Sequence, residues 1–153
     1  MAVIVTGLIP LLAIAILSLS VSTKIKNSLV AANLAQEGIE VVRSLRDDNW
    51  YRGNPFNAGL IGTWRVQWNT NWSSNPPQAV GLNPPLNIDI SDVYSYDLGT
   101  TTGFTRTLTI TEPAPGIELK VISLVEWDSK YQTPGCSVGK SCIKVEAHLF
   151  NWK

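Results

Sequence analysis

Residues 1–23 read MAVIVTGLIPLLAIAILSLSVST, a stretch without a charged side chain. The 12 basic and 12 acidic residues of the chain all lie at or after Lys24. An α-helix rises about 1.5 Å per residue, so this stretch would be about 34 Å long, enough to cross a hydrocarbon core about 30 Å thick. We therefore expect residues 1–23 to form an apolar helix that lies in a membrane.

The alternatives for residues 1–23 are a secretory signal peptide and a buried helix of a soluble domain. The apolar region of a secretory signal peptide is shorter, about 7–15 residues. A helix that is apolar all round would have to be surrounded by other protein, and a chain of 153 residues is too small to surround one of this length. Gly7 and Pro10 interrupt the segment. Proline removes a helix hydrogen bond, so we expect a kink or a locally unwound stretch there.

Residues 24–50 have the period of a helix with one apolar face. Apolar or small residues recur at spacings of three and four, which predicts that this face packs against the rest of the chain. The residues expected to pack are Leu34, Gly38, Val41, Val42 and Leu45. No helix-breaking residue separates this segment from the apolar one, so we expect one continuous helix. Gly53 and Pro55 predict where it ends.

Residues 51–153 read as a small antiparallel β domain. Alternating apolar and polar residues predict strands at 64–68, 86–90, 104–111, 119–127 and 143–152. Short connectors with Gly or Pro predict antiparallel neighbours that have one packed face. The predicted fold class is α+β, with a long N-terminal helix (apolar over 1–23, amphipathic over 24–50) packed on a small antiparallel sheet.

Cys136 and Cys142 are six positions apart, in the connector between the last two predicted strands. A single pair that closes a short loop is consistent with a disulfide in an oxidising compartment, and two free thiols in a cytosolic loop are the alternative. His148 is the one histidine and there is no second cysteine pair. We therefore expect no zinc site and no other metal.

The charge balance and the motif content bear on the class of function. The net charge is zero, without the basic excess typical of a nucleic-acid binder, so we expect no nucleic-acid partner. The same balance removes long-range repulsion between copies. The sequence contains neither a nucleophile elbow nor a glycine-rich phosphate loop. We expect no enzymatic activity, no catalytic residue and no cofactor.

Two stretches near the ends of the chain carry a family resemblance. One is AANLAQEGIEVVR at 31–43, which runs into Arg46-Asp47. The other is VEW at 125–127, followed after a turn by VEAHLFNWK at 145–153. Together with a helix that is first apolar and then amphipathic, they resemble the prepilin-type proteins, the type IV pilin and pseudopilin family. The middle of the chain diverges from that family.

The resemblance implies a structural subunit that polymerises through its apolar helix into an extracellular type IV pilus-like filament, with roles such as adhesion and motility. The subunit would lie in the cytoplasmic membrane as a precursor. Pilus assembly machinery would then add it to a helical homopolymer of identical subunits on the cell surface. Pilin helices unwind on polymerisation near the place of Gly7 and Pro10. The residues expected to line the filament core are Val3, Ile4, Leu8, Ile9, Leu11, Leu12, Ile14, Ile16, Leu17 and Leu19.

The N-terminus departs from the family pattern. The family has a short basic leader that ends in Gly and is cleaved, and a Glu at the fifth mature position. Val5 stands at position 5 here, and the first acidic residue is Glu37. Either Met1 is the mature N-terminus of a subunit without that Glu, or the sequence begins several residues late. We favour the second explanation.

The orientation in the membrane follows from two opposing signals. Lys24 and Lys26 directly after the apolar stretch would, by the positive-inside rule alone, place the head in the cytoplasm. A basic leader would reverse that orientation, and the cysteine pair favours the outside. We expect the head outside the cell.

Two other functions are alternatives to a main filament subunit. A minor pilin or a type II secretion pseudopilin primes or tips an assembly without forming its bulk. A monomeric, membrane-anchored extracellular binding domain could use Trp64, Trp68 and Trp72 as a surface on which a ligand stacks. Core packing is the alternative for these tryptophans, because Trp64 and Trp68 share one face of a predicted strand.

Overall fold

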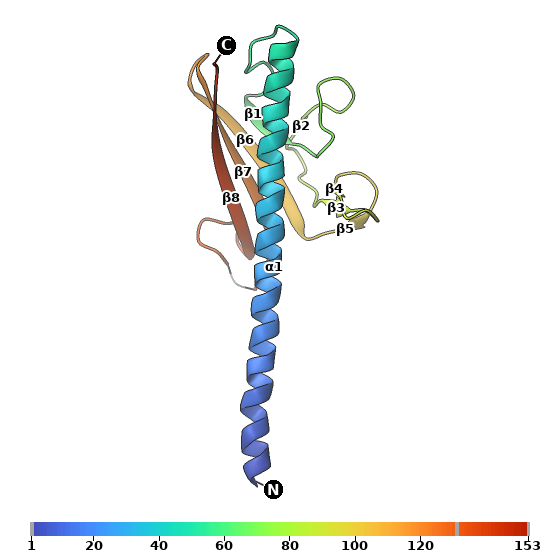
Figure 1. The fold of residues 1–153 in the computed structure, drawn as a ribbon, viewed down its shortest axis with the longest axis vertical. Helices are drawn as coiled ribbons and strands as arrows, with labels where there is room; N and C mark the ends of the chain where they lie inside the picture. The colour runs from blue at the N-terminus through green and yellow to red at the C-terminus, as the bar shows by residue number, and fades with distance from the viewer. Residues whose placement is uncertain (1, 131, 153) are drawn as a thin grey trace. The chain divides into compact units, whose positions relative to one another are not determined.

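The structure, a computed structural model, describes residues 2–130 and 132–152. Within these ranges it describes the side chains of Ile14 and of the residues from Leu17 onward. The chain forms two compact units, Met1–Val30 and Ala31–Lys153, and the boundary between them falls within the one helix (Figure 1). Each unit is described by itself below.

Helix α1 runs from Ala2 to Tyr51. It is assigned as helix without a break through Gly7 and Pro10, so unwinding at these residues on assembly stays a prediction. The helix ends in a Schellman motif, as the glycine after it predicts. Gly53 has a φ of 73°, its N–H donates to Trp50 O (3.1 Å), and the next N–H, of Asn54, donates to Asn49 O (2.9 Å).

The second unit holds two antiparallel sheets rather than the single sheet predicted. The larger has the order β2-β1-β6-β7-β8, and its strands are Gly62–Arg65 (β1), Gln78–Ala79 (β2), Phe104–Ala114 (β6), Glu118–Asp128 (β7) and Lys140–Phe150 (β8). The smaller has the order β4-β3-β5, with strands Asn87–Ile88 (β3), Tyr94–Ser95 (β4) and Thr100–Thr101 (β5). The α+β class with antiparallel pairing is confirmed. Of the strands of the smaller sheet, β3 lies within the predicted strand at 86–90, whereas β4 and β5 were not predicted because two-residue strands carry no period.

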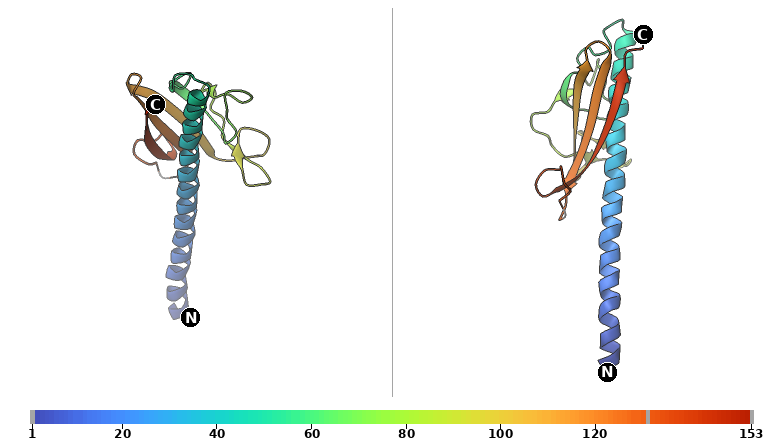
Figure 2. Two further views of the ribbon diagram at one scale, coloured as in Figure 1. Left: turned by 45° about the horizontal axis from the view of Figure 1, so that its top comes forward. Right: turned by 90° about the vertical axis from the view of Figure 1, so that its left-hand side faces the viewer.

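The core of the second unit lies between the larger sheet and residues 31–51 of α1 (Figure 2). The five residues expected to pack from the helix, Leu34, Gly38, Val41, Val42 and Leu45, are all buried. Inward residues of β6 and β7 meet them, among them Leu108 and Val121. The packed part of the helix begins at Ala31, later than the Lys24 expected from the sequence, because Ile25 and Leu29 remain exposed in the first unit.

Gly38 is the point of closest approach between helix and sheet. A Cβ atom there would lie 2.9 Å from Ser123 Oγ and 3.3 Å from both Leu108 Cδ1 and Arg106 Cδ. Glycine inside a helix costs about 1 kcal/mol relative to alanine. Here the missing side chain lets α1 approach β6 and β7.

Arg106 is fully buried on the inner face of β6, between Phe104 and Leu108. Its Nη1 donates to Leu34 O (2.9 Å) and to Glu37 Oε1 (3.0 Å), and its Nη2 donates to Val66 O (2.6 Å). One guanidinium therefore joins α1, β6 and the chain after β1. The sequence pattern assigned only apolar residues to this face, so Arg106 was missed.

Candidate functional site

The described residues from Ile14 to Leu29 present a stripe of large hydrophobic side chains. Ile14, Leu17, Val21, Ile25 and Leu29 are each between 55% and 63% exposed. Spacings of three and four residues place them on one face of the helix. Leu19 lies off this stripe and is more exposed still. We call the five residues the apolar stripe.

Two hydroxyl side chains of this segment bond to the helix backbone. Ser20 Oγ donates to Leu17 O (2.8 Å), and Thr23 Oγ1 donates to Leu19 O (3.1 Å). Hydroxyl groups bonded in this way need no partner outside the helix. The segment can therefore enter apolar surroundings without leaving these groups unsatisfied.

Most of the predicted filament-core residues lie outside the described side chains. They are Val3, Ile4, Leu8, Ile9, Leu11, Leu12 and Ile16, and their role stays a prediction. The other three, Ile14, Leu17 and Leu19, are described and exposed. Among the residues that the structure describes, no helix has the length and hydropathy of a membrane span.

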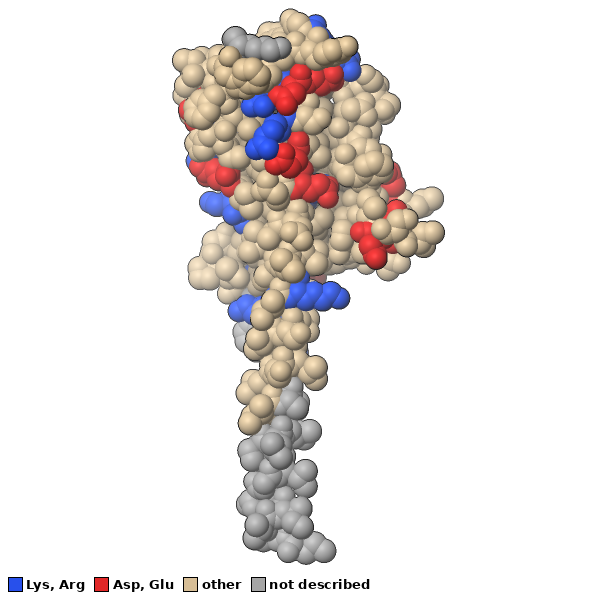
Figure 3. Space-filling model, viewed as in Figure 1, with Lys and Arg blue, Asp and Glu red and all other residues tan. Residues whose placement is uncertain are grey.

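The charged residues of the two units are arranged differently. Lys24 and Lys26 are exposed, and neither forms an ion pair with a described residue. In the second unit, acidic side chains of α1 pair with nearby basic ones: Glu40 with Arg43 (2.7 Å), and Asp48 with Arg52, the residue after the helix (3.0 Å). Figure 3 shows acidic and basic side chains close together on the upper part of the face it draws. Such exposed pairs each contribute about 0–1 kcal/mol.

Cys136, in the β7–β8 connector, forms a disulfide with Cys142, near the start of β8. Further bonds hold the same loop: Ser137 N–H donates to Glu126 Oε1 (3.0 Å), and Thr133 Oγ1 bonds to Ser141 Oγ (3.2 Å). The bridge closes a ring across a separation of six residues. The bridge thus fixes the loop that joins β7 and β8, the two strands that pair over the greatest length.

Replacing both cysteines by serine is expected to lower the free energy of unfolding by about 2 kcal/mol, because the loop-entropy relation gives that value for a ring of this size. Urea denaturation of the variant measures the loss. Reduced wild-type protein is the matched control and should unfold at the midpoint of the variant. An unchanged midpoint in both would contradict a stabilising bridge.

The three tryptophans considered for ligand stacking have different surroundings. The indole N–H of Trp64 donates to Leu60 O (2.7 Å), that of Trp72 donates to Leu45 O (3.0 Å), and both rings pack on the core. Trp68 is 58% exposed. Its predicted place on the face of Trp64 is wrong, because β1 ends at Arg65 and the chain then turns. The structure does not expose the three rings on one surface.

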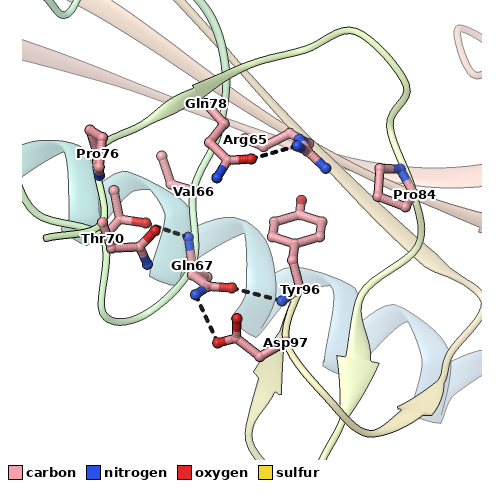
Figure 4. A pocket seen from close by; sticks show the side chains of 10 residues that line it. Arg65, Val66, Gln67, Thr70, Pro76, Gln78, Pro84, Tyr96 and Asp97 are labelled. Atoms are coloured by element: carbon pink, nitrogen blue, oxygen red, sulfur yellow. Dashed lines mark hydrogen bonds between the residues drawn. The ribbon is translucent and has the colours of Figure 1, made fainter.

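A cavity of about 240 Å³ lies beside β1 and β4, with Arg65, Gln67, Gln78, Tyr96 and Asp97 among its lining residues (Figure 4). Gln67 accepts a bond from Tyr96 N–H (2.7 Å) and donates to Asp97 Oδ2 (3.0 Å). Arg65 donates to Gln78 Oε1 (2.6 Å) and lies over the Tyr96 ring. Burial raises the pKa of Tyr96, against the opposing effect of nearby arginines. Most of these polar groups bind one another and connect the loops around the cavity, although Arg65 Nε has no hydrogen-bond partner among the described residues.

His148 lies on the exposed face of the larger sheet, between the carboxylates of Glu118 on β7 and Glu146 on its own strand, β8. Its Nδ1 contacts Glu118 and its Nε2 lies 3.1 Å from Glu146 Oε1. Hydrogen bonding to Glu118, and then to Glu146, raises the pKa of His148 above its ordinary value. Glu146 also pairs with Lys120 (2.8 Å), and this bond lowers the pKa of its carboxyl. The group is a cross-strand charge network, and no nucleophile adjoins it.

Within residues 2–130 and 132–152, no group of three or more His, Cys, Asp or Glu side chains is arranged to hold a metal ion. Comparison of the chain with family models, with curated protein sequences and with solved structures gave no match in any of the three. The candidate functional feature is therefore the apolar stripe, and it is argued from its own residues.

Proposed function

We propose that the chain is a structural subunit of an extracellular filament of the type IV pilus kind, which assembles through the apolar N-terminal part of α1. The observation that carries the proposal is the apolar stripe, Ile14, Leu17, Val21, Ile25 and Leu29, on the same helix whose residues 31–51 are built into a folded head. One helix thus supplies both the core of the head and an uncovered apolar surface.

The apolar stripe needs a cover. Apolar surface removed from water contributes roughly 25 cal/mol per Å², so five large side chains left more than half exposed favour any arrangement that covers them. The hydrocarbon of a membrane is one cover, and the same segment of neighbouring copies is another. We propose that the hydrocarbon of the membrane surrounds the apolar stripe before assembly, and that the same segment of neighbouring copies replaces the hydrocarbon in the filament.

Moving the apolar segment from a membrane into a filament requires energy from outside the subunit. We propose that pilus assembly machinery supplies this energy. The hydroxyl bonds of Ser20 and Thr23 support the proposal, because they let the segment lie among apolar neighbours in either state. The Cys136–Cys142 disulfide supports a head outside the cytoplasm. The resemblance at 31–43 and 145–153 supports the pilin family in particular. The same geometry would serve a minor pilin or a pseudopilin.

Leu17→Asp is expected to abolish filaments while the head stays folded, because the substitution places a charge within the apolar stripe. Leu82→Asp is the matched control, since Leu82 is an exposed leucine of a head loop. The measurement is electron microscopy of sheared surface material, with circular dichroism of each variant to check folding. Normal filaments from the Leu17 variant would contradict the proposal.

A further inference from the structure

The larger sheet ends at β8, and no described strand pairs with the outer edge of β8 (Figure 1). The strand is 11 residues long and pairs with β7 over its whole length without a register shift. Natural proteins protect such an edge with proline, a bulge, a very short strand, a cover or charged side chains. Residues 140–150 contain charged side chains but no proline, and the strand has no bulge. An edge of this kind can accept a further strand.

The hydrogen bonds at the two ends of the β7–β8 ladder show which residues of β8 face outward. At one end, Asn151 N–H donates to Ile117 O (2.8 Å). At the other end, Ser129 N–H donates to Gly139 O (3.2 Å). Bonded pairs alternate along an antiparallel ladder, so the odd-numbered residues of β8 bond to β7. The even-numbered residues therefore direct their N–H and C=O groups away from β7.

The loop before β8 agrees with this phase and sets one end of the free edge. Thr133 N–H donates to Lys140 O (3.2 Å), which is an outward group of an even-numbered residue. Among the described residues, no other backbone hydrogen bond reaches the outer edge of β8. The outward groups of residues 142–150 are thus open to a new strand.

The side chains of β8 suit a second copy of the same strand. On the inner face, Ile143, Val145 and Ala147 are only partly buried, so the edge leaves apolar surface uncovered. On the outer face, Lys144 and Glu146 are two residues apart and therefore lie side by side, with opposite charges. The ion pairs of Glu146 within its own copy use one carboxylate oxygen, Oε1. Its other oxygen has no partner among the described residues.

We propose that β8 of one copy pairs antiparallel with β8 of a second copy, about a twofold axis at Val145. The even-numbered residues of 142–148 then form the bonded pairs of the new ladder, since their backbone groups point outward in both copies. Lys144 of each copy lies opposite Glu146 of the other copy.

The side chains select this register. A shift of the pairing by two residues places Lys144 opposite Lys144 in one direction, or Glu146 opposite Glu146 in the other direction. Like charges directly opposite one another destabilise a pair of strands, whereas opposite charges stabilise it. On the inner face, the same register brings Val145 beside its counterpart and Ile143 beside Ala147. Both faces of the strand are therefore complementary to themselves.

This contact goes beyond the proposed function. An interface in which each copy uses the same surface is isologous and closes as a dimer. The two copies run in opposite directions, whereas the copies of one helical filament share a direction. In assembled material the contact therefore joins the heads of two neighbouring filaments. The contact itself requires only the folded head.

Zero-length carbodiimide crosslinking of the full chain, purified in detergent, tests the contact. Copies with light and heavy nitrogen are mixed, so that a crosslink between two copies gives peptides of mixed isotope content. We expect mixed peptides that join Lys144 to Glu146. Their absence, or peptides of one isotope only, would overturn the inference and leave the proposed function standing, because the experiment needs no filament. A chain that forms this crosslink but no filaments would overturn the proposed function alone.

Two substitutions at one residue separate the backbone contact from the charge. Lys144→Ala and Lys144→Pro both remove the charge, but only proline also removes the outward N–H and blocks the edge. That N–H points away from β7, so we expect circular dichroism to show a folded head in both variants. Sedimentation equilibrium in detergent measures the dissociation constant of the dimer. We expect Lys144→Ala to raise it about 2- to 30-fold and Lys144→Pro to leave no measurable dimer. Equal constants for the two variants, or a wild-type chain that is monomeric, would overturn the inference.

Discussion

Replacing Arg106 by alanine is expected to lower the free energy of unfolding of the head by about 3–5 kcal/mol. The guanidinium is fully buried and bonds to Leu34 O, Glu37 Oε1 and Val66 O. Its removal leaves a cavity and withdraws a donor from two backbone carbonyls. Glu37 is partly exposed, so water replaces part of the lost ion pair, and most of the cost falls on the carbonyls and the cavity.

Arg43→Ala is the matched control for this change. Arg43 pairs with Glu40 on the exposed face of α1, and a pair of that kind contributes about 0–1 kcal/mol. Urea denaturation followed by circular dichroism gives both values. If the Arg106 variant lost no more stability than the Arg43 variant, Arg106 would not join the helix to the sheet in the way the geometry indicates.

Replacing Gly38 by leucine is expected to destabilise the head by about 1–3 kcal/mol or more, through overpacking. A Cβ alone would lie 2.9 Å from Ser123 Oγ, and the atoms beyond it would meet Leu108 and Arg106. Asn33→Leu, at an exposed position of the same helix, is the control and should change stability by less than about 0.5 kcal/mol.

A double-mutant cycle locates the cause. Gly38→Ala adds only the Cβ atom, whose closest neighbour is the hydroxyl oxygen of Ser123. In a Ser123→Ala background that oxygen is gone, so the same Gly38→Ala change should cost less than in the wild type. Equal costs in the two backgrounds would show that the packing between α1 and β7 is looser than described.

The long elements of the fold could be predicted because each carries a strong period. The amphipathic pattern up to Leu45 and the glycine at 53 predicted the helix and its end, which the Schellman motif at Gly53 explains. The alternation in β6, β7 and β8 predicted those strands to within a few residues at each end. In these elements, the pattern of burial and the local backbone preference agree.

The parts that were missed depend on partners that a sequence does not mark. Two of the three groups that Arg106 binds are backbone carbonyls. The carbonyl of Leu34 lies beside β6 because α1 packs there, and that of Val66 because it follows β1, which pairs with β6. One signal of this role was present in the sequence, because a charged residue between Phe104 and Leu108 breaks an otherwise apolar strand face. The exposure of Trp68 depends on where β1 ends, and strand ends are set by the turn that follows rather than by the period.

The sequence predicted the kind of functional feature, an apolar helical segment, but it did not predict the geometry of that feature. The uncharged run at 1–23 indicated an apolar segment, and the structure adds the apolar stripe, which continues past Lys24 to Leu29. The depression on the smaller sheet, lined by Ile88, Ile90 and Leu98 among others, could not be foreseen, because the strands that form it have two residues each.

The structure of the assembled material, determined by electron cryo-microscopy of filaments sheared from cells that express this chain, tests the central claim most directly. The account predicts a helical polymer in which residues 1–23 of neighbouring copies pack together in the core and the heads, residues 51–153, form the outer layer. Filaments in which this segment faces solvent, or monomers dispersed in membranes without any filament, would contradict it.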